Sequence, residues 1–435
     1  MSAAPDTATP LARLAGVLPG LPGGTDVRAR RAEALERLLA LGLPSTRDEA
    51  WKYTNLRLIA RRELAPAPSR PVDAGTLGAL PAREGATFVF VDGRFSPALS
   101  GGTMPVGVTF TPLAEVLAGS IPDALSARLS ATDAIDDRIR LLNSALLADG
   151  GILDVGRTDV RAELSVVHVA TGGGAHSRLL VTLAPGANAR LTEYHLAPND
   201  AESLAVPVAD LVLGAGANLE HYSIGLNGAK AVGLEDVTVR LGADATYRHR
   251  HLAFGAQLAR LDLRVRLEGT GSSARLAGLL LAEHSQQIDV RTLVEHAAPH
   301  TTSDQVYRGV ANGRGRGSYD GKVVVHAGAR KADSKQSSRN LILSKDASIE
   351  SRPQLEINTD DVKCSHGATT GALDEGMLFY LLARGLDRDT ARALLTFAFA
   401  EDVIAGIALP TLRRFIEERV LGSLPAGALI RDFIA

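Results

Sequence analysis

The middle of the chain alternates between apolar and polar positions. From Leu261 to Leu267 every second residue is apolar and the residues between are charged. The same alternation runs from Val237 to Leu241 and from Ile288 to Arg291. Successive side chains of a β-strand point to opposite faces, so this pattern predicts strands with one buried face and one polar face. We expect such strands over residues 151–370.

The predicted strands recur at a nearly constant spacing. Val239 and Val265 are 26 residues apart, and Val265 and Val290 are 25 apart. The turn residues Gly186-Ala187-Asn188 return as Gly216-Ala217-Asn218, 30 residues later. A period of this length with strand content is typical of a solenoid whose coils bury one face against their neighbours. The pattern therefore favours a mainly β fold, a β-helix, while an antiparallel β-sandwich remains the alternative because it shares the alternation.

The two ends of the chain follow other patterns. Residues 1–150 predict a helical or mixed region, whose first 25 or so residues are rich in Ala, Pro and Gly and are expected to be mobile. An amphipathic helix is expected from Asp26 to about Leu43. Residues 371–435 predict three helices, which begin near Asp374, Asp387 and Pro410. We expect this helical end to cover the open edge of the last coil.

Composition narrows the class of protein. The formal net charge is −2, which argues against nucleic acid or an anionic membrane as the main partner. Only 4% of residues are aromatic and 43 are glycine, which suits a narrow interior and many turns. The single cysteine, Cys364, excludes an internal disulfide and favours a reducing compartment. With no signal-like segment and no long apolar run, we expect a cytoplasmic protein.

One short segment carries candidate metal chemistry. Cys364 and His366 are two residues apart, so on an extended strand both point the same way. A thiolate and an imidazole are good ligands for iron, and Lys363 beside them would favour the thiolate. The alternative is a buried structural thiol and a histidine bonded to the backbone. His249 and His251 also share a strand face, but no clear ligand pattern accompanies them.

Three motifs resemble one known family. DDVKCSHGATTGALDEGMLFYLLARG (Asp360–Gly385), SKQSSRNLILS (Ser334–Ser344) and EAWKYTNLRLI (Glu49–Ile59) are similar to segments of the SufB/SufD family of Fe–S cluster assembly scaffold subunits. The K-C-S-H run and the single cysteine resemble the SufD branch. The resemblance covers most of the chain from about residue 45.

The resemblance implies a right-handed parallel β-helix flanked by helical regions. It also implies a non-enzymatic role in a SufB–SufC–SufD complex. SufB would pair with this chain and share a nascent Fe–S site involving His366 and Cys364. The SufC ATPase would dock on the C-terminal helices, where Phe397, Phe399 and Glu401 are candidates. A homodimer is possible in isolation, and a role for flavin stays open.

The number of thiol ligands in the chain leads to the same expectation as the resemblance. A cluster usually takes four protein ligands, mostly thiolates, and this chain has one thiol. Any cluster is therefore expected to be completed by a partner. No G-x-x-x-x-G-K-[ST] motif is present, so ATP hydrolysis would belong to a partner. Two alternatives stay open: a SufB-like scaffold that assembles clusters by itself, and a β-helix enzyme acting on polysaccharide.

Overall fold

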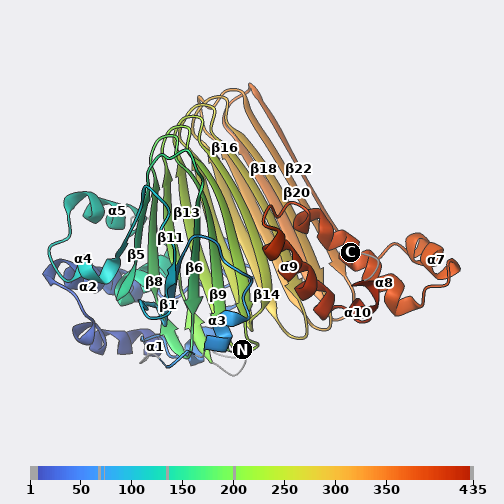
Figure 1. The fold of residues 1–435 in the computed structure, drawn as a ribbon, viewed down its shortest axis with the longest axis horizontal. Helices are drawn as coiled ribbons and strands as arrows, with labels where there is room; N and C mark the ends of the chain where they lie inside the picture. The colour runs from blue at the N-terminus through green and yellow to red at the C-terminus, as the bar shows by residue number, and fades with distance from the viewer. Residues whose placement is uncertain (1–7, 67–69, 73, 134–136, 199–201, 432–435) are drawn as a thin grey trace.

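The architecture is a parallel β-helix with helices at both ends (Figure 1). It is seen in a computed structural model that describes residues 8–66, 70–72, 74–133, 137–198 and 202–431. Eight coils each add one strand to each of two sheets, and the coil strands pair in parallel. The predicted β-helix is confirmed. Among the described residues, antiparallel pairing is confined to the short strands β2 and β3 beside β1 and to β4 beside β5, so the antiparallel sandwich is excluded.

The first sheet runs in the order β2, β1, β6, β9, β12, β14, β16, β18, β20, β22, with β3 beside β1. Its strands are β1 (Ala86–Val91), β2 (Arg94–Phe95), β3 (Gly101–Gly102), β6 (Ala162–Val169), β9 (Asn188–Ala197), β12 (Asn218–Asn227), β14 (Thr246–Gly255), β16 (Ser273–Ala282), β18 (Thr302–Ala311), β20 (Ala332–Ile342) and β22 (Val362–Gly371).

The second sheet runs in the order β21, β19, β17, β15, β13, β11, β8, β5, β4, with β7 and β10 at its side. Its strands are β4 (Val108–Pro112), β5 (Asp149–Val155), β7 (Gly173–Ala175), β8 (Ser177–Leu183), β10 (Ser203–Ala205), β11 (Val208–Leu213), β13 (Val232–Leu241), β15 (Leu258–Leu267), β17 (Gln287–His296), β19 (Arg316–Val325) and β21 (Ser348–Ile357).

The spacing read from the sequence matches the register at one step and misses it at the next. Val239 pairs with Val265, as the 26-residue spacing predicts. Val265, however, pairs with Val294 and not with Val290. The connections at residues 268–272 and 283–286, which separate β15 from β17, are together longer than those at 242–245 and 256–257, which separate β13 from β15. Apolar alternation alone cannot distinguish registers that differ by an even number of residues.

The interior of the coils is filled mainly by Leu, Val, Ala and Ile, as the low aromatic content predicts. The largest rings inside the later coils are Tyr307 and Tyr319, whose stacked ring centroids lie 4.3 Å apart. Gly278 makes room for them, because a Cβ there would lie 2.4 Å from the Tyr307 ring. Interior packing thus depends on small residues opposite the few large ones.

The N-terminal helices are α1 (Ala8–Arg13), α2 (Thr25–Leu41), α3 (Ala74–Gly78), α4 (Leu113–Leu117), α5 (Asp123–Asp133) and α6 (Arg138–Leu146), with 3-10 turns at Leu14–Gly16, Leu18–Gly20, Glu49–Trp51 and Leu56–Arg61. Residues 1–7 lie outside the described residues. The following segment was expected to be mobile, yet it forms short helices with Leu11, Leu14 and Leu21 buried. These leucines pack on the apolar stripe of α2, which composition alone does not reveal.

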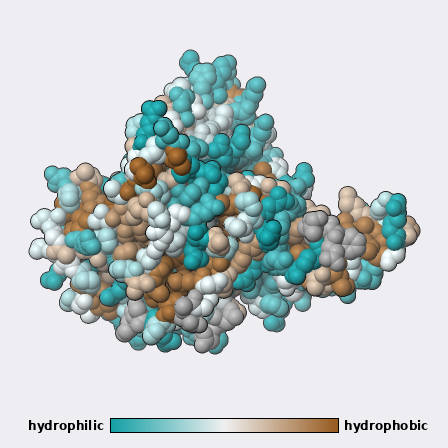
Figure 2. Space-filling view, viewed as in Figure 1, coloured by the Kyte–Doolittle hydropathy of each residue, from teal (hydrophilic) through white to brown (hydrophobic). Residues whose placement is uncertain are grey.

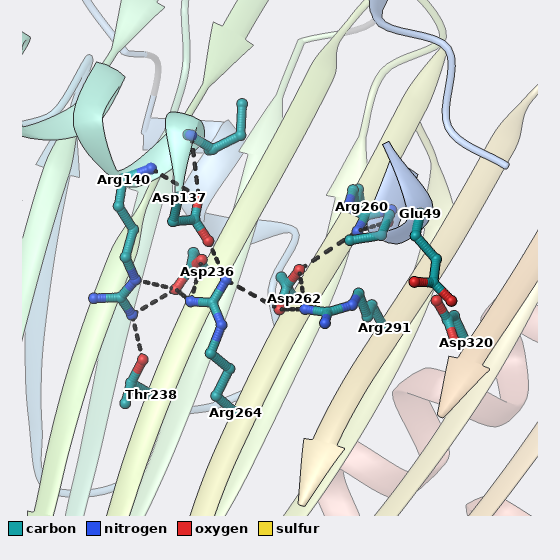
Figure 3. A network of polar contacts seen from close by, with 12 residues as sticks. Glu49, Asp137, Arg140, Asp236, Thr238, Arg260, Asp262, Arg264, Arg291 and Asp320 are labelled. Carbon is teal, nitrogen blue, oxygen red and sulfur yellow. Dashed lines mark hydrogen bonds and ion pairs between the residues drawn. The ribbon is translucent and has the colours of Figure 1, made fainter. Parts of the chain in front are cut away.

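An ion-pair ladder fixes this N-terminal region to the outer face of the second sheet (Figure 3). Arg140 of α6 pairs with Asp210 at 2.8 Å and with Asp236 at 2.5 Å. Arg264 bridges Asp236 and Asp137. The pairs are buried and each charge has a partner, so removal of one member would leave an uncompensated buried charge.

The C-terminal helices are α7 (Glu375–Ala383), α8 (Arg388–Ile404), α9 (Pro410–Ser423) and α10 (Gly427–Ile430). Asp374 and Asp387 cap α7 and α8, and Pro410 begins α9, as predicted. These helices do not cover the last coil. Instead α8 and α9 pack on the outer face of the first sheet, where Phe397 and Ile416 contact residues such as Tyr222 and Leu252. The expected cap is therefore wrong, and α7 projects from the body (Figure 1).

Candidate functional site

Cys364 and His366 lie on β22, the last strand of the first sheet. Parallel pairing places Cys364 beside Ser334 and His366 beside Gln336. Ser334 and Gln336 are buried and face the interior of the β-helix. In-register neighbours point to the same side of a sheet, so Cys364 and His366 also face inward. The prediction that these two side chains share a face is confirmed.

The two residues differ in exposure because the last coil is uncovered. Cys364 packs partly against the interior apolar core, whereas His366 is exposed. From Ser365 to Gly371 every residue of β22 is exposed. The inward face of β22 is thus uncovered. We use the term open end for the last coil, β21 and β22, together with the interior that these strands border.

The environment of Cys364 favours the thiol over the thiolate. Burial raises the pKa of Cys364, and the nearby Asp333 carboxylate raises it further, against a smaller opposing effect of a hydrogen bond from the Ser334 backbone. Lys363 was expected to favour the thiolate, but the pKa of Cys364 is raised and Lys363 is not among the groups that shift it. That expectation is therefore wrong.

Within the described residues, no three His, Cys, Asp or Glu side chains are placed to hold a metal ion. The open end presents two donor groups of this kind, Cys364 and His366.

The interior also holds a cluster that sequence reasoning missed. Its members, which we call the histidine–glutamate cluster, are His168, Glu193, His195, His221, Glu235, His249 and His251, and all are buried. The Nε2 atoms of His168 and His221 lie 3.2 and 2.8 Å from the Glu193 carboxylate. The alternation identified the shared face of His249 and His251, but only the register brings the other members beside them.

Burial and hydrogen bonding set the protonation of this cluster. Burial would raise the pKa of Glu193, yet the hydrogen bonds from His168 and His221 hold it well below its usual range. Burial lowers the pKa of His195 to about 3 and that of His251 to about 4. These two imidazoles are therefore neutral at pH 7.

The structure places the three predicted docking residues in different environments. Phe397 is buried in the core between α8 and the first sheet. Glu401 forms an ion pair with Arg413 of α9 at 2.6 Å. Phe399 lines a groove of about 420 Å³ between β22, α7 and α8, together with Met377 and Leu395.

Exposed apolar residues lie instead on α7. The exposed fractions are 60% for Met377, 72% for Phe379 and 56% for Tyr380. Figure 2 shows apolar surface on the projecting arm that α7 forms. Leu378 is the buried residue of this helix. None of the helices in the described residues is long and apolar enough to cross a membrane.

Comparison with known proteins gives one consistent result. A family described as "SUF system FeS cluster assembly, SufBD core domain" matches residues 166–399. The iron–sulfur cluster assembly protein SufD of Escherichia coli is 29% identical over 93% of this chain and 95% of its own length. A SufBD family protein of Synechocystis is 26% identical over 88% of each chain. Protein ABCI7, chloroplastic, of Arabidopsis thaliana is 26% identical over 93% of this chain and 84% of its own.

The matched region includes most of the β-helix coils and much of α8. It also contains β22 with Cys364 and His366, the two donors at the open end. The chain therefore belongs to the SufB/SufD family of iron–sulfur cluster assembly proteins, and within that family it is SufD-like.

Proposed function

We propose that this chain is the non-enzymatic SufD-type subunit of a SufB–SufC–SufD complex and pairs with a SufB-type partner through its open end. The observation that carries the proposal is the uncovered last coil. β21 and β22 each have a strand neighbour on one side only. Free strand edges present unpaired backbone groups, which a second β-helix can satisfy by continuing both sheets.

Pairing at this end would enclose the inward-facing donors. Cys364 and His366 supply two ligands, and a SufB-type partner would supply the rest, so that a nascent Fe–S cluster is held between the two chains as cargo. A site shared in this way opens when the chains separate, which suits transfer of the finished cluster. The raised pKa of Cys364 fits a thiol that becomes a ligand only when iron displaces its proton.

The SufC-type ATPase would dock on α7 and the adjoining groove. This surface combines exposed Met377, Phe379 and Tyr380 with Phe399 at the groove wall. A contiguous apolar surface rimmed by polar groups is typical of a protein–protein interface. ATP would bind to that partner and not to this chain. The complex would work in the cytoplasm, and this chain would form homodimers through the same open end when SufB is missing.

The central experiment is co-purification with SufB-type and SufC-type partners, followed by measurement of iron and acid-labile sulfide. His366→Ala should leave the complex intact and lower cluster yield about fivefold or more, since one of the few ligands is lost. His284→Ala, on an exposed turn, is the matched control and should leave the yield unchanged. Unchanged yield in His366→Ala would remove this residue from the site, and loss of the complex would make its role architectural.

The docking surface is tested in the same preparation. Phe379→Glu should abolish capture of the SufC-type partner while the SufB-type partner is retained, because it places a charge in the apolar surface of α7. Leu429→Glu on α10 is the control, since Leu429 is also exposed, at 62%, but lies outside the groove. Equal capture by both variants would contradict docking on α7.

A further inference from the structure

A polar layer lies beneath the open end, in the two coils that precede the last one. Its members are Gln336 of β20, Tyr319 of β19, Gln305 of β18 and Thr292 of β17, and all four are buried. Like the histidine–glutamate cluster, this layer interrupts an interior that is mainly apolar. Buried amides and hydroxyls lower stability unless they are hydrogen-bonded, so the partner of each of these groups matters.

The four side chains form a chain of hydrogen bonds with a defined direction. Thr292 Oγ1 and the Tyr319 hydroxyl both donate to Gln305 Oε1, at 2.8 and 3.1 Å. The Tyr319 hydroxyl has one proton, so it accepts from Gln336, whose Nε2 lies 2.9 Å away. The Gln336 amide nitrogen is thus bonded to Tyr319, which leaves its oxygen, Oε1, free to accept a hydrogen bond from another group.

The acceptor end of Gln336 has no partner within the described residues. Gln336 Oε1 makes no hydrogen bond in the described chain. Because Gln336 is only 3% exposed, bulk water does not replace the missing partner. Its in-register neighbour on the next strand is His366. Adjacent strands are about 4.8 Å apart, so the Gln336 and His366 side chains leave neighbouring backbone positions on the same inward face.

The space for the Gln336 amide is provided by Gly321 of β19, on the second sheet. A Cβ on Gly321 would lie 2.1 Å from Gln336 Nε2 and 2.5 Å from the Tyr319 hydroxyl. A glycine at this interior position is thus required by the Gln336–Tyr319 contact. The polar layer is rigid, since the Tyr319 ring is also stacked on Tyr307.

We infer that Gln336 is a positioning residue for His366. By accepting the N–H of one imidazole nitrogen, Gln336 Oε1 selects a single tautomer and leaves a lone pair on the other nitrogen. A histidine that binds a metal usually donates its second ring nitrogen to a fixed acceptor, which sets the ring orientation and strengthens the ligand. This inference rests on the proposed function of His366 as a ligand and adds the residue that prepares it.

The tautomer of His366 is measured directly in the full chain, labelled with ¹⁵N-histidine, by two-bond proton–nitrogen correlation. The signal of His366 is assigned by its loss in His366→Ala. In the native chain we expect one dominant tautomer. Gln336→Met, which keeps the length but removes the acceptor, should give a mixture of both tautomers. Gln336→Glu retains an acceptor oxygen and should restore the single tautomer.

Two further variants separate positioning from a structural effect. Tyr319→Phe removes the hydroxyl that holds the Gln336 amide and should shift the tautomer in the same direction, less strongly, without touching His366. Gln354→Met is the matched control, because Gln354 lies on the neighbouring last coil but bonds to Asp320 on the outer face. It should leave the tautomer unchanged. Thermal melting of each variant checks that the fold is retained.

The outcomes distinguish this inference from the proposed function. If Gln336→Met leaves the His366 tautomer unchanged in a folded chain, Gln336 does not position it, even if His366→Ala abolishes cluster yield. If Gln336→Met mixes the tautomers while His366→Ala leaves the yield unchanged, the positioning stands and the ligand role of His366 fails. A fall in yield in Gln336→Met, restored by Gln336→Glu, supports both.

Discussion

Two regions of the same interior carry imidazoles, and they differ in access to solvent. The histidine–glutamate cluster lies in the early coils and is sealed on all sides. His366 belongs to the open end, which the chain leaves uncovered. His221, His249 and His366 even occupy one interior column, separated by Leu276, Gln305 and Gln336. The same residue type at equivalent positions is thus buried in one place and exposed to solvent in the other.

The apolar layer between the two regions keeps them apart. The interior between the two regions is filled by apolar side chains, among them Leu276 and Leu280 of β16 and Leu261 and Leu263 of β15. No hydrogen bond between described residues links the histidine–glutamate cluster with the polar layer under His366. We therefore expect the two regions to respond independently to substitution.

The largest expected effect is the difference in stability between deletion of a buried imidazole and deletion of an exposed one. His221→Ala removes one of two hydrogen-bond donors to the buried Glu193 carboxylate and leaves a cavity, so it should lower the free energy of unfolding by about 3–5 kcal/mol. His366→Ala removes an exposed side chain and should change it by less than about 0.5 kcal/mol. Urea denaturation of both variants checks this, and equal losses would remove the distinction between sealed and open.

Acid should destabilise the folded chain through its buried histidines, two of which belong to the histidine–glutamate cluster. His195 and His251, with pKa values lowered to about 3 and about 4 by burial, stay neutral in the folded chain while they bind protons in the unfolded chain below about pH 6.5. Stability therefore falls as pH decreases through this window, by about 1.4 kcal/mol per pH unit for each histidine.

The pH dependence is measured by denaturation at pH 7, 6 and 5. His195→Gln should reduce the slope by the share of one histidine. The neighbouring Glu193 and Glu235 face the same residues, and Glu235 has a pKa raised by burial, so its protonation partly opposes the loss. A slope that is identical in native chain and His195→Gln would show that His195 is protonated when folded.

A smaller effect is expected at the open end, where chemistry replaces stability as the readout. Asp333→Asn removes the charge that helps to raise the pKa of Cys364 and should speed alkylation of this single thiol about two- to fivefold at pH 8. Asp361→Asn is the control, because Asp361 pairs with Lys331 at 2.9 Å instead. Mass spectrometry follows the reaction, and equal rates would assign the raised pKa to burial alone.

The smallest effect is expected at His249. Both of its ring nitrogens are buried without a hydrogen-bond partner in the described residues. Buried ring nitrogens without hydrogen bonds destabilise the folded state, and an apolar side chain of similar size removes this effect. His249→Leu should therefore change the free energy of unfolding by less than about 1 kcal/mol, or raise it. A loss as large as that of His221→Ala would indicate that His249 has a partner, such as a buried water.

The sequence by itself determined which way each strand residue points. Strict alternation identified strands of the coils, and the i, i+2 spacing of Cys364 and His366 places both on one face of an extended strand. Local signals such as Asp374, Asp387 and Pro410 also located the C-terminal helices, because capping depends on neighbours within one turn.

The tertiary structure alone decided which residues meet across coils. Gln336 lies beneath His366 because of a register over 30 positions, and that register depends on turn lengths that alternation does not encode. The same holds for the helices: whether Phe397 is core or surface, and whether α8 covers the first sheet or the last coil, follows from long-range packing of apolar faces that the local pattern leaves equivalent.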